Sequence, residues 1–121
     1  NPSDDFNYFR RSDVYEFLGK YNLAIADLSK FLESNKVDEQ AIFARGKLYL
    51  ANQQYQLAID DFTNALAIAD DSDNYDFDDF QKEILPLRMK AYKALKNKTA
   101  FCTDLKILDE TANCDKEWKK K

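Results

Sequence analysis

The sequence repeats itself with a period of 34 residues, and this feature limits the possible folds more than any other. The segment that begins at Phe9 can be laid over the segment that begins at Phe43 without a gap, and nine positions are then identical. The identical pairs are Phe9 and Phe43, Arg11 and Arg45, Tyr15 and Tyr49, Tyr21 and Tyr55, Leu23 and Leu57, Ala24 and Ala58, Ile25 and Ile59, Asp27 and Asp61, and Leu32 and Leu66. A shift of 43 residues adds a third copy, in which Arg88, Lys90, Tyr92, Ala94 and Asp104 match Arg45, Lys47, Tyr49, Ala51 and Asp61. Such periods are typical of proteins that stack small structural units in a row.

Each copy divides into two stretches in which apolar side chains recur three and four positions apart, as in amphipathic helices. In the second copy, Ile42, Gly46 and Tyr49 share one face of the first stretch, and Ala58 and Phe62 share one face of the second. Small residues such as Gly46 allow two helices to cross closely, while large residues fill the space beside them. Neither helix can bury its apolar face alone, so we expect helical hairpins stacked in series.

The composition favours a single folded helical domain. The 121 residues are 45% hydrophobic and 33% charged, and they include only two glycines and two prolines, whereas a β-rich domain needs more of both for its turns. The net charge of -4 disfavours nucleic-acid binding, which depends on a basic surface. No apolar run reaches the length of a membrane span, so we expect no membrane insertion.

The second copy resembles the tetratricopeptide repeat family. The residues that carry the resemblance are Ile42, Arg45, Gly46, Tyr49, Tyr55, Ala58, Phe62 and Ala65. The first copy departs from the pattern at Ser12 and Phe31, and the third departs further at Met89, Lys98 and Phe101. The resemblance implies an all-α, right-handed superhelix of three antiparallel helical hairpins, which we place at residues 5–38, 39–72 and 82–115. A short capping helix is expected to start within residues 112–121.

An acidic insert at about residues 70–80 separates the second and third repeats. It contains six aspartates interleaved with Tyr75, Phe77 and Phe80. A calcium loop of the EF-hand type requires a glycine at its sixth position and a bidentate acid at its twelfth, and no frame here offers both. We therefore expect no metal site, and we interpret the acids as the start of the next helix, where the helix dipole favours negative charge.

Catalysis is not indicated by the residue types present. The chain has no histidine, which is the commonest general base and metal ligand, and it has no glycine-rich phosphate loop. Two cysteines without histidine cannot form the usual four-ligand zinc site. The aspartates that recur once per repeat, Asp27, Asp61 and Asp104, are interpreted as surface or helix-pairing acids rather than as a catalytic pair. The recurrent arginines, Arg11, Arg45 and Arg88, are expected to pair with acids or to lay their stems on neighbouring aromatic rings. We expect no enzymatic activity and no cofactor.

Cys102 and Cys114 are the only cysteines, and two interpretations of them stay open. Cys102 stands where the other copies have Ile25 and Ile59, a position that faces the next helix, and Cys114 falls at the start of that helix. A disulfide between them is possible, and it would indicate an oxidising compartment such as the bacterial periplasm or the cell exterior. Alternatively, both are buried thiols in a cytoplasmic protein. The segment around Cys102 is similar to the ends of many bacterial tetratricopeptide proteins.

The family resemblance implies that the first helix of each hairpin lines a concave groove. The residues expected to face it are Phe6, Phe9, Arg10, Asp13, Glu16 and Phe17 in the first copy; Gln40, Phe43, Ala44, Lys47 and Leu50 in the second; and Glu83, Leu87, Lys90 and Lys93 in the third. The groove is thus aromatic at one end and basic at the other. The lysine and asparagine clamp with which some family members bind chaperone tails is absent from the matching positions.

We expect the groove to bind a protein or peptide partner, with apolar anchors against Phe9, Phe17 and Phe43 and acidic residues near Lys47, Lys90 and Lys93. The alternative is a structural role, in which the groove is filled by the chain's own ends or by a second copy in a homodimer. The identity of the partner is not encoded in any motif.

Overall fold

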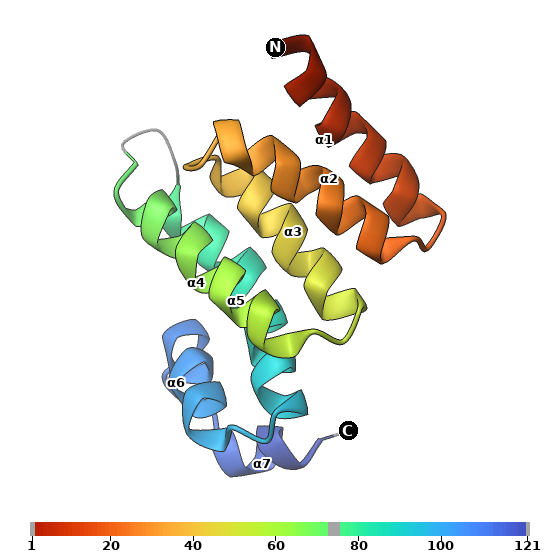
Figure 1. Ribbon diagram of the computed structural model, residues 1–121. Helices are drawn as coiled ribbons and strands as arrows, with labels where there is room; N and C mark the ends of the chain where they lie inside the picture. The colour runs from red at the N-terminus through yellow and green to blue at the C-terminus, as the bar shows by residue number, and fades with distance from the viewer. Residues whose placement is uncertain (1, 73–75, 121) are drawn as a thin grey trace.

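The structure is a computed structural model that describes residues 2–72 and 76–120, with side chains described from residue 7 onward. This part of the chain forms seven helices: α1 (Pro2–Phe17), α2 (Tyr21–Ser34), α3 (Glu39–Ala51), α4 (Tyr55–Asp70), α5 (Phe77–Ala94), α6 (Lys98–Leu108) and α7 (Cys114–Lys119). Consecutive helices pair as antiparallel hairpins, α1 with α2, α3 with α4 and α5 with α6, and the hairpins follow one another in a row (Figure 1). The all-α hairpin array expected from the repeat is confirmed.

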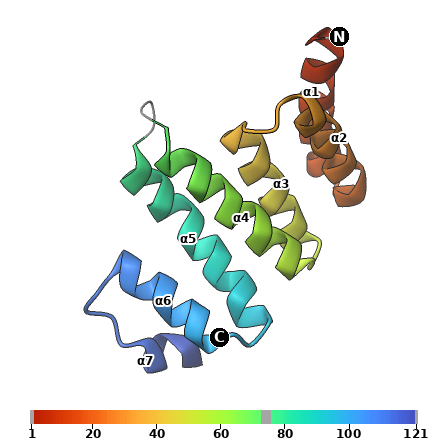
Figure 2. The same cartoon turned by 60° about the vertical axis from the view of Figure 1, so that its left-hand side comes forward.

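The row runs from one end of the molecule to the other without doubling back. Figure 2 shows α1 and α2 at one end and α6 and α7 at the other, with the two chain termini far apart. Each second helix contacts the first helix of the next hairpin, α2 with α3 and α4 with α5, so every hairpin is packed against its neighbour. In addition, α3 contacts α5, which places the first helices of the last two hairpins side by side.

The turn inside each hairpin is built in the same way three times. One residue has a positive φ, namely Gly19 at 73°, Gln53 at 62° and Lys96 at 60°. The next residue then donates its backbone N–H to a tyrosine carbonyl, at 2.8 Å in each case; the acceptors are Tyr15, Tyr49 and Tyr92. Left-handed backbone is unfavourable for residues other than glycine, so packing of the two helices must hold Gln53 and Lys96 in it.

Side-chain caps begin both helices that follow a connection between hairpins. The carboxylate of Asp38 accepts from Ala41 N at the start of α3, and that of Asp76 accepts from Asp79 N at the start of α5. Asp76 of the acidic insert therefore caps α5. This agrees with the interpretation of the acids as the start of the next helix. The insert also lengthens α5, which begins at Phe77, ahead of the third repeat expected from the sequence. Residues 73–75, which include Tyr75, lie outside the described residues.

Two clusters of buried residues link the hairpins, and the partly buried Phe9 and Tyr49 pack against both. One cluster of buried residues joins α2 to α3 through Ala24, Ile25, Leu28 and Leu48. A larger cluster joins the second hairpin to α5; its buried members are Leu32, Ala41, Ile42, Phe43, Ala58, Phe62, Ala65, Leu66, Ala69, Phe80, Ile84 and Leu85. Each hairpin thus completes the apolar face of its neighbour, which is how a serial stack becomes stable.

Gly46 lies where α3 and α4 approach closely. A Cβ atom at this position would lie 2.7 Å from Cε1 of Phe62 and 3.2 Å from Cβ of Asp61. Phe62 is fully buried, so its ring has little room to move aside. The first hairpin has the larger Ser12 at the matching position, and there the facing residue is the smaller Leu28. The second hairpin thus pairs the smaller Gly46 with the larger Phe62, whereas the first pairs the larger Ser12 with the smaller Leu28.

Candidate functional site

An arginine on each first helix forms an ion pair with an aspartate on the second helix of the same hairpin. Its Nε donates to one carboxylate oxygen and its Nη2 to the other, at distances of 2.6 to 2.8 Å. The pairs are Arg11 with Asp27, Arg45 with Asp61, and Arg88 with Asp104. Each guanidinium carbon also lies 5.7 or 5.8 Å from the ring centroid of the tyrosine four residues further along. These recurrent charges clamp the hairpins, as the sequence indicated.

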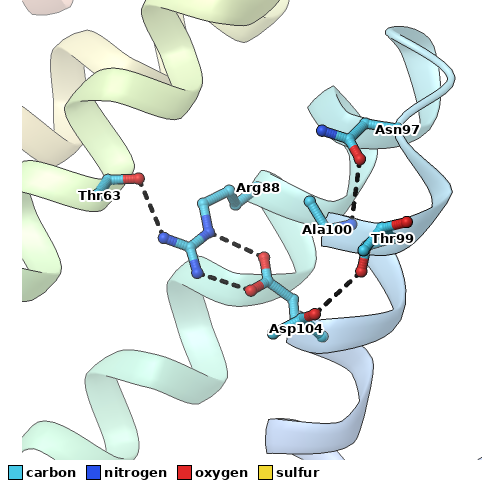
Figure 3. A network of polar contacts seen from close by, with 7 residues as sticks. Thr63, Arg88, Asn97, Thr99, Ala100 and Asp104 are labelled. Carbon is cyan, nitrogen blue, oxygen red and sulfur yellow. Dashed lines mark hydrogen bonds and ion pairs between the residues drawn. The ribbon is translucent and has the colours of Figure 1, made fainter.

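Two of these arginines, Arg45 and Arg88, also connect neighbouring hairpins. Nη1 of Arg45 donates to Oγ of Ser29 at 3.2 Å, and Nη1 of Arg88 donates to Oγ1 of Thr63 at 3.0 Å. Figure 3 shows Arg88 between Asp104 of its own hairpin and Thr63 of the preceding one. This contact was not predicted from the sequence, although Ser29 and Thr63 are 34 residues apart and both carry a hydroxyl group. The contact fixes the register between hairpins.

Burial of these ion pairs increases along the array. The exposed fraction of the arginine side chain is 56% for Arg11, 23% for Arg45 and 14% for Arg88. The hydrogen bond to Asp61 raises the pKa of Arg45. Burial disfavours the charged form of Arg88, but the hydrogen bond and charge of Asp104 outweigh it, so the pKa of Arg88 is raised as well. All three guanidinium groups thus remain charged. They stabilise the hairpins and do not act as proton donors or acceptors.

Phe43 does not lie on an open surface, so its predicted role as an exposed anchor is wrong. Its side chain is only 3% exposed, and its ring makes edge contacts with Phe62 at 6.0 Å and with Phe80 at 5.4 Å between centroids. Phe80 comes from the acidic insert, which the repeat alignment leaves unmatched. Because the insert lengthens α5, Phe80 covers a ring that the repeat pattern alone would leave in the groove. Phe43 is a core residue.

The other predicted aromatic and apolar groove residues differ in exposure. Phe9 is half-buried, with its ring 5.3 Å from that of Phe31, and Leu50 is half-buried against the core. Phe17 is 90% exposed at the end of α1. Phe6 belongs to α1, but its side chain lies outside the described residues. The aromatic end of the groove is therefore smaller than the sequence suggested, and Phe17 is its most accessible member.

Two of the predicted basic residues are exposed at equivalent positions. Lys47 on α3 and Lys90 on α5 are separated by the repeat shift of 43 residues, and both side chains are exposed. The ammonium of Lys47 lies 4.5 Å above the ring centroid of Phe43, so the buried ring supports the charge from below. Arg10 and Asp13 on α1 are exposed as well. We call the exposed side chains of Arg10, Asp13 and Phe17 on α1, Lys47 on α3 and Lys90 on α5 the inner surface.

Lys93 forms hydrogen bonds with the backbone of the C-terminal helix. Its ammonium donates to the backbone carbonyls of Glu117, at 3.4 Å, and of Lys120. It also lies 5.8 Å from the ring centroid of Phe101. A cation at the C-terminal end of a helix is favourable because the last carbonyl groups there lack partners within the helix. Lys93 therefore positions α7, and we exclude it from the inner surface.

A disulfide joins α6 to α7. Cys102 and Cys114 are bonded, with their Cα atoms 5.5 Å apart. The ring of Trp118 on α7 packs against that of Phe101 on α6 at 5.2 Å between centroids, and Lys98 forms an ion pair with Asp115 at 2.6 Å. The Lys98 ammonium lowers the pKa of the Asp115 carboxyl group. A helix of six residues is too short to be stable alone, so these contacts are what hold it.

The described residues show no arrangement that would hold a metal ion. Among the side chains described, those of residues 7–72 and 76–120, no group of three or more cysteine, aspartate or glutamate residues is placed for metal binding. In the same part of the chain, no helix is long and apolar enough to cross a membrane.

Comparison with known proteins identifies the repeat. A family model described as "Tetratricopeptide repeat" matches residues 7–38 and 39–72. The chain is 44% identical over 59 residues to the chicken (Gallus gallus) protein "DnaJ homolog subfamily C member 3". This match covers 49% of the chain but only 12% of the length of that relative. No solved structure matches the chain. Since the family model covers more than half of the residues and the hairpins stack as the repeat predicts, the chain belongs to the tetratricopeptide repeat family.

Proposed function

We propose that this chain is a non-catalytic interaction module that binds a partner protein through an acidic peptide segment held on the inner surface. Tetratricopeptide repeats generally mediate protein–protein interactions, which gives the general class of function. The acidic character of the segment is inferred from the charges that the inner surface presents.

The observation that carries this proposal is the pair Lys47 and Lys90. Both ammonium groups are exposed on neighbouring first helices, and α3 and α5 are in direct contact. Among the described residues, no acidic side chain forms an ion pair with either of them, whereas the charges of Arg45 and Arg88 beside them are paired with those of Asp61 and Asp104. Two repeated, unneutralised cations on adjacent helices are suited to acidic residues spaced along one peptide.

An apolar contribution comes from the side chains beside the lysines. Leu50 lies one helical turn beyond Lys47 on α3 and is half-buried, and Phe17 on α1 is 90% exposed. Aromatic residues on an accessible surface often anchor a partner. We therefore expect the peptide to combine acidic residues opposite Lys47 and Lys90 with an apolar side chain near Leu50 or Phe17. The buried Phe43 supports Lys47 and does not itself contact the peptide.

The proposal can be tested by selecting ligands from a random peptide display library and measuring their affinity by calorimetry. We expect the selected peptides to be enriched in Asp and Glu and to bind more weakly as salt is added. Reversing both charges, K47E/K90E, should weaken binding at least tenfold, because attraction is replaced by repulsion.

A matched control separates local contacts from net charge. The double variant K20E/K96E makes the same change in net charge, but at exposed residues in the turns of the first and third hairpins. We expect it to keep the affinity within about threefold. The proposal is contradicted if the library yields no acidic preference, or if the control variant loses as much affinity as K47E/K90E.

A second candidate function is self-association, and the exposure of Phe17 favours it. The matching positions in the other two hairpins carry the small residues Ala51 and Ala94, so Phe17 adds apolar bulk that the fold does not require. Val14 and Leu18, at 56% and 55% exposed, extend this apolar patch. Sedimentation equilibrium of the chain and of F17A tests this candidate: a dimer that F17A dissociates supports it, and a monomeric parent protein excludes it.

A further inference from the structure

The turn between α5 and α6 carries an acceptor sequence for asparagine-linked glycosylation. Asn97, Lys98 and Thr99 form an Asn-x-Thr triplet in which the middle residue is not proline. It is the only such triplet in the sequence, since Asn1-Pro2-Ser3 has proline in the middle. The corresponding turns of the first two hairpins carry Lys20 and Gln54 in place of Asn97. The acceptor triplet is thus a feature of the third hairpin alone.

The geometry at Asn97 leaves the reactive amide nitrogen available. Oδ1 of Asn97 accepts a hydrogen bond from Ala100 N at 3.1 Å and so caps the N-terminus of α6. Figure 3 shows the side-chain nitrogen on the opposite side, directed away from Ala100. The surrounding residues 94–99 are all exposed. A glycan on Nδ2 would therefore leave the helix cap intact and would displace no core residue.

The disulfide supplies an independent indication of the compartment. Cys102 is one helical turn beyond Thr99, and both residues line the same shallow cavity of about 360 Å³ on α6. Disulfides persist in oxidising compartments and are rare in reducing ones. The acceptor triplet and the oxidised cysteine pair thus lie on one short helix, and both belong to the chemistry of a secretory lumen.

We propose that Asn97 carries an N-linked glycan, attached in an oxidising secretory lumen. The donor class is an oligosaccharide linked through its anomeric carbon to a lipid pyrophosphate, and a lumenal glycosyltransferase brings it to the chain. Nδ2 attacks that carbon, so an N–C bond forms while the bond from carbon to the pyrophosphate oxygen breaks. The lipid pyrophosphate leaves with the bonding electron pair, and the amide proton passes to a base of the transferase. No oxidant or reductant takes part.

The direct test is mass spectrometry of the protein purified from its own source. Digestion with peptide N-glycosidase in ¹⁸O water converts a glycosylated asparagine into ¹⁸O-labelled aspartate. We expect this label at Asn97 and an intact Cys102–Cys114 bond in the same sample. The proposal is overturned if Asn97 is recovered unmodified. This holds whether the cysteines are bonded, as in a bacterial periplasm, or free, as in a cytosol.

A second experiment tests the acceptor residues in the full chain, translated with a signal sequence in the presence of rough microsomes. We expect a slower band that endoglycosidase removes. N97D should lose the band completely while keeping a carboxylate oxygen to cap α6, and T99A should lose it while T99S keeps it. Circular dichroism of N97D checks that the fold is unchanged. A translocated chain without the slower band, or a band that survives in N97D, would contradict the proposal.

Discussion

Replacing Asp104 by asparagine should strongly destabilise the array, because it leaves a buried guanidinium without its counterion. The side chains of Arg88 and Asp104 are 14% and 3% exposed, and the pair is bidentate. Removing one partner of a buried ion pair typically costs about 3 to 5 kcal/mol. We expect a value near the lower end, about 3 kcal/mol, since Arg88 keeps its hydrogen bond to Thr63.

Urea unfolding followed by far-ultraviolet circular dichroism measures this loss. With a denaturant slope of about 2 kcal/mol per M, a loss of about 3 kcal/mol lowers the midpoint by about 1.5 M. The matched control is Asp27→Asn, which removes the same group opposite Arg11, whose side chain is 56% exposed. Water solvates Arg11 after the change, so the midpoint should fall by clearly less.

A double variant separates the role of charge from that of packing. Replacing both Arg88 and Asp104 by leucine removes the buried charges together, and such replacements are often neutral or stabilising. We therefore expect R88L/D104L to recover much of the stability that D104N loses. Equal losses for Asp104→Asn and Asp27→Asn, or a loss below about 1 kcal/mol for Asp104→Asn, would refute the reasoning that burial sets the strength of each pair.

Two further predictions concern packing and the C-terminal helix. Gly46→Ala should destabilise by about 1 to 2 kcal/mol despite the better helix propensity of alanine, because its Cβ would lie 2.7 Å from the Phe62 ring. Adding Phe62→Leu should restore part of the loss, and a urea double-mutant cycle with no coupling would argue against the contact. Reducing the Cys102–Cys114 bond, which closes a loop with a sequence separation of 12, should cost roughly 3 kcal/mol. Emission from Trp118, packed on α6, should then shift to longer wavelength; an unchanged spectrum would show that α7 stays docked without the bond.

The repeat alone was sufficient to predict the hairpins, because every copy brings its own helices, turn and ion pair. The alignment also indicated that the recurrent arginines and aspartates are structural, and all three form pairs. The alignment also contains a signal for the contact between hairpins. Ser29 and Thr63 both carry a hydroxyl group at a spacing of one repeat, and each accepts a hydrogen bond from the arginine of the next hairpin.

The groove was predicted less well, because residues outside the repeat pattern decide which of its side chains are accessible. Phe80 belongs to the insert, has no counterpart in the other copies, and covers Phe43. Lys93 looked like a groove cation, but its position lies beside α7, which follows the last repeat. Lys47 and Lys90 are both exposed, and their neighbours are set by the repeat itself. Periodicity therefore predicts the scaffold, and irregular segments determine the surface.

The central claim is that a partner peptide binds across α3 and α5 through Lys47 and Lys90. Titrating the ¹⁵N-labelled chain with a selected acidic peptide, and following the amide resonances by nuclear magnetic resonance, tests it most directly. The claim predicts that the largest shifts occur on α3 and α5 around Lys47, Leu50 and Lys90, and that they vanish in K47E/K90E. Shifts confined to the second helices α2, α4 and α6, or unchanged in K47E/K90E, would contradict it.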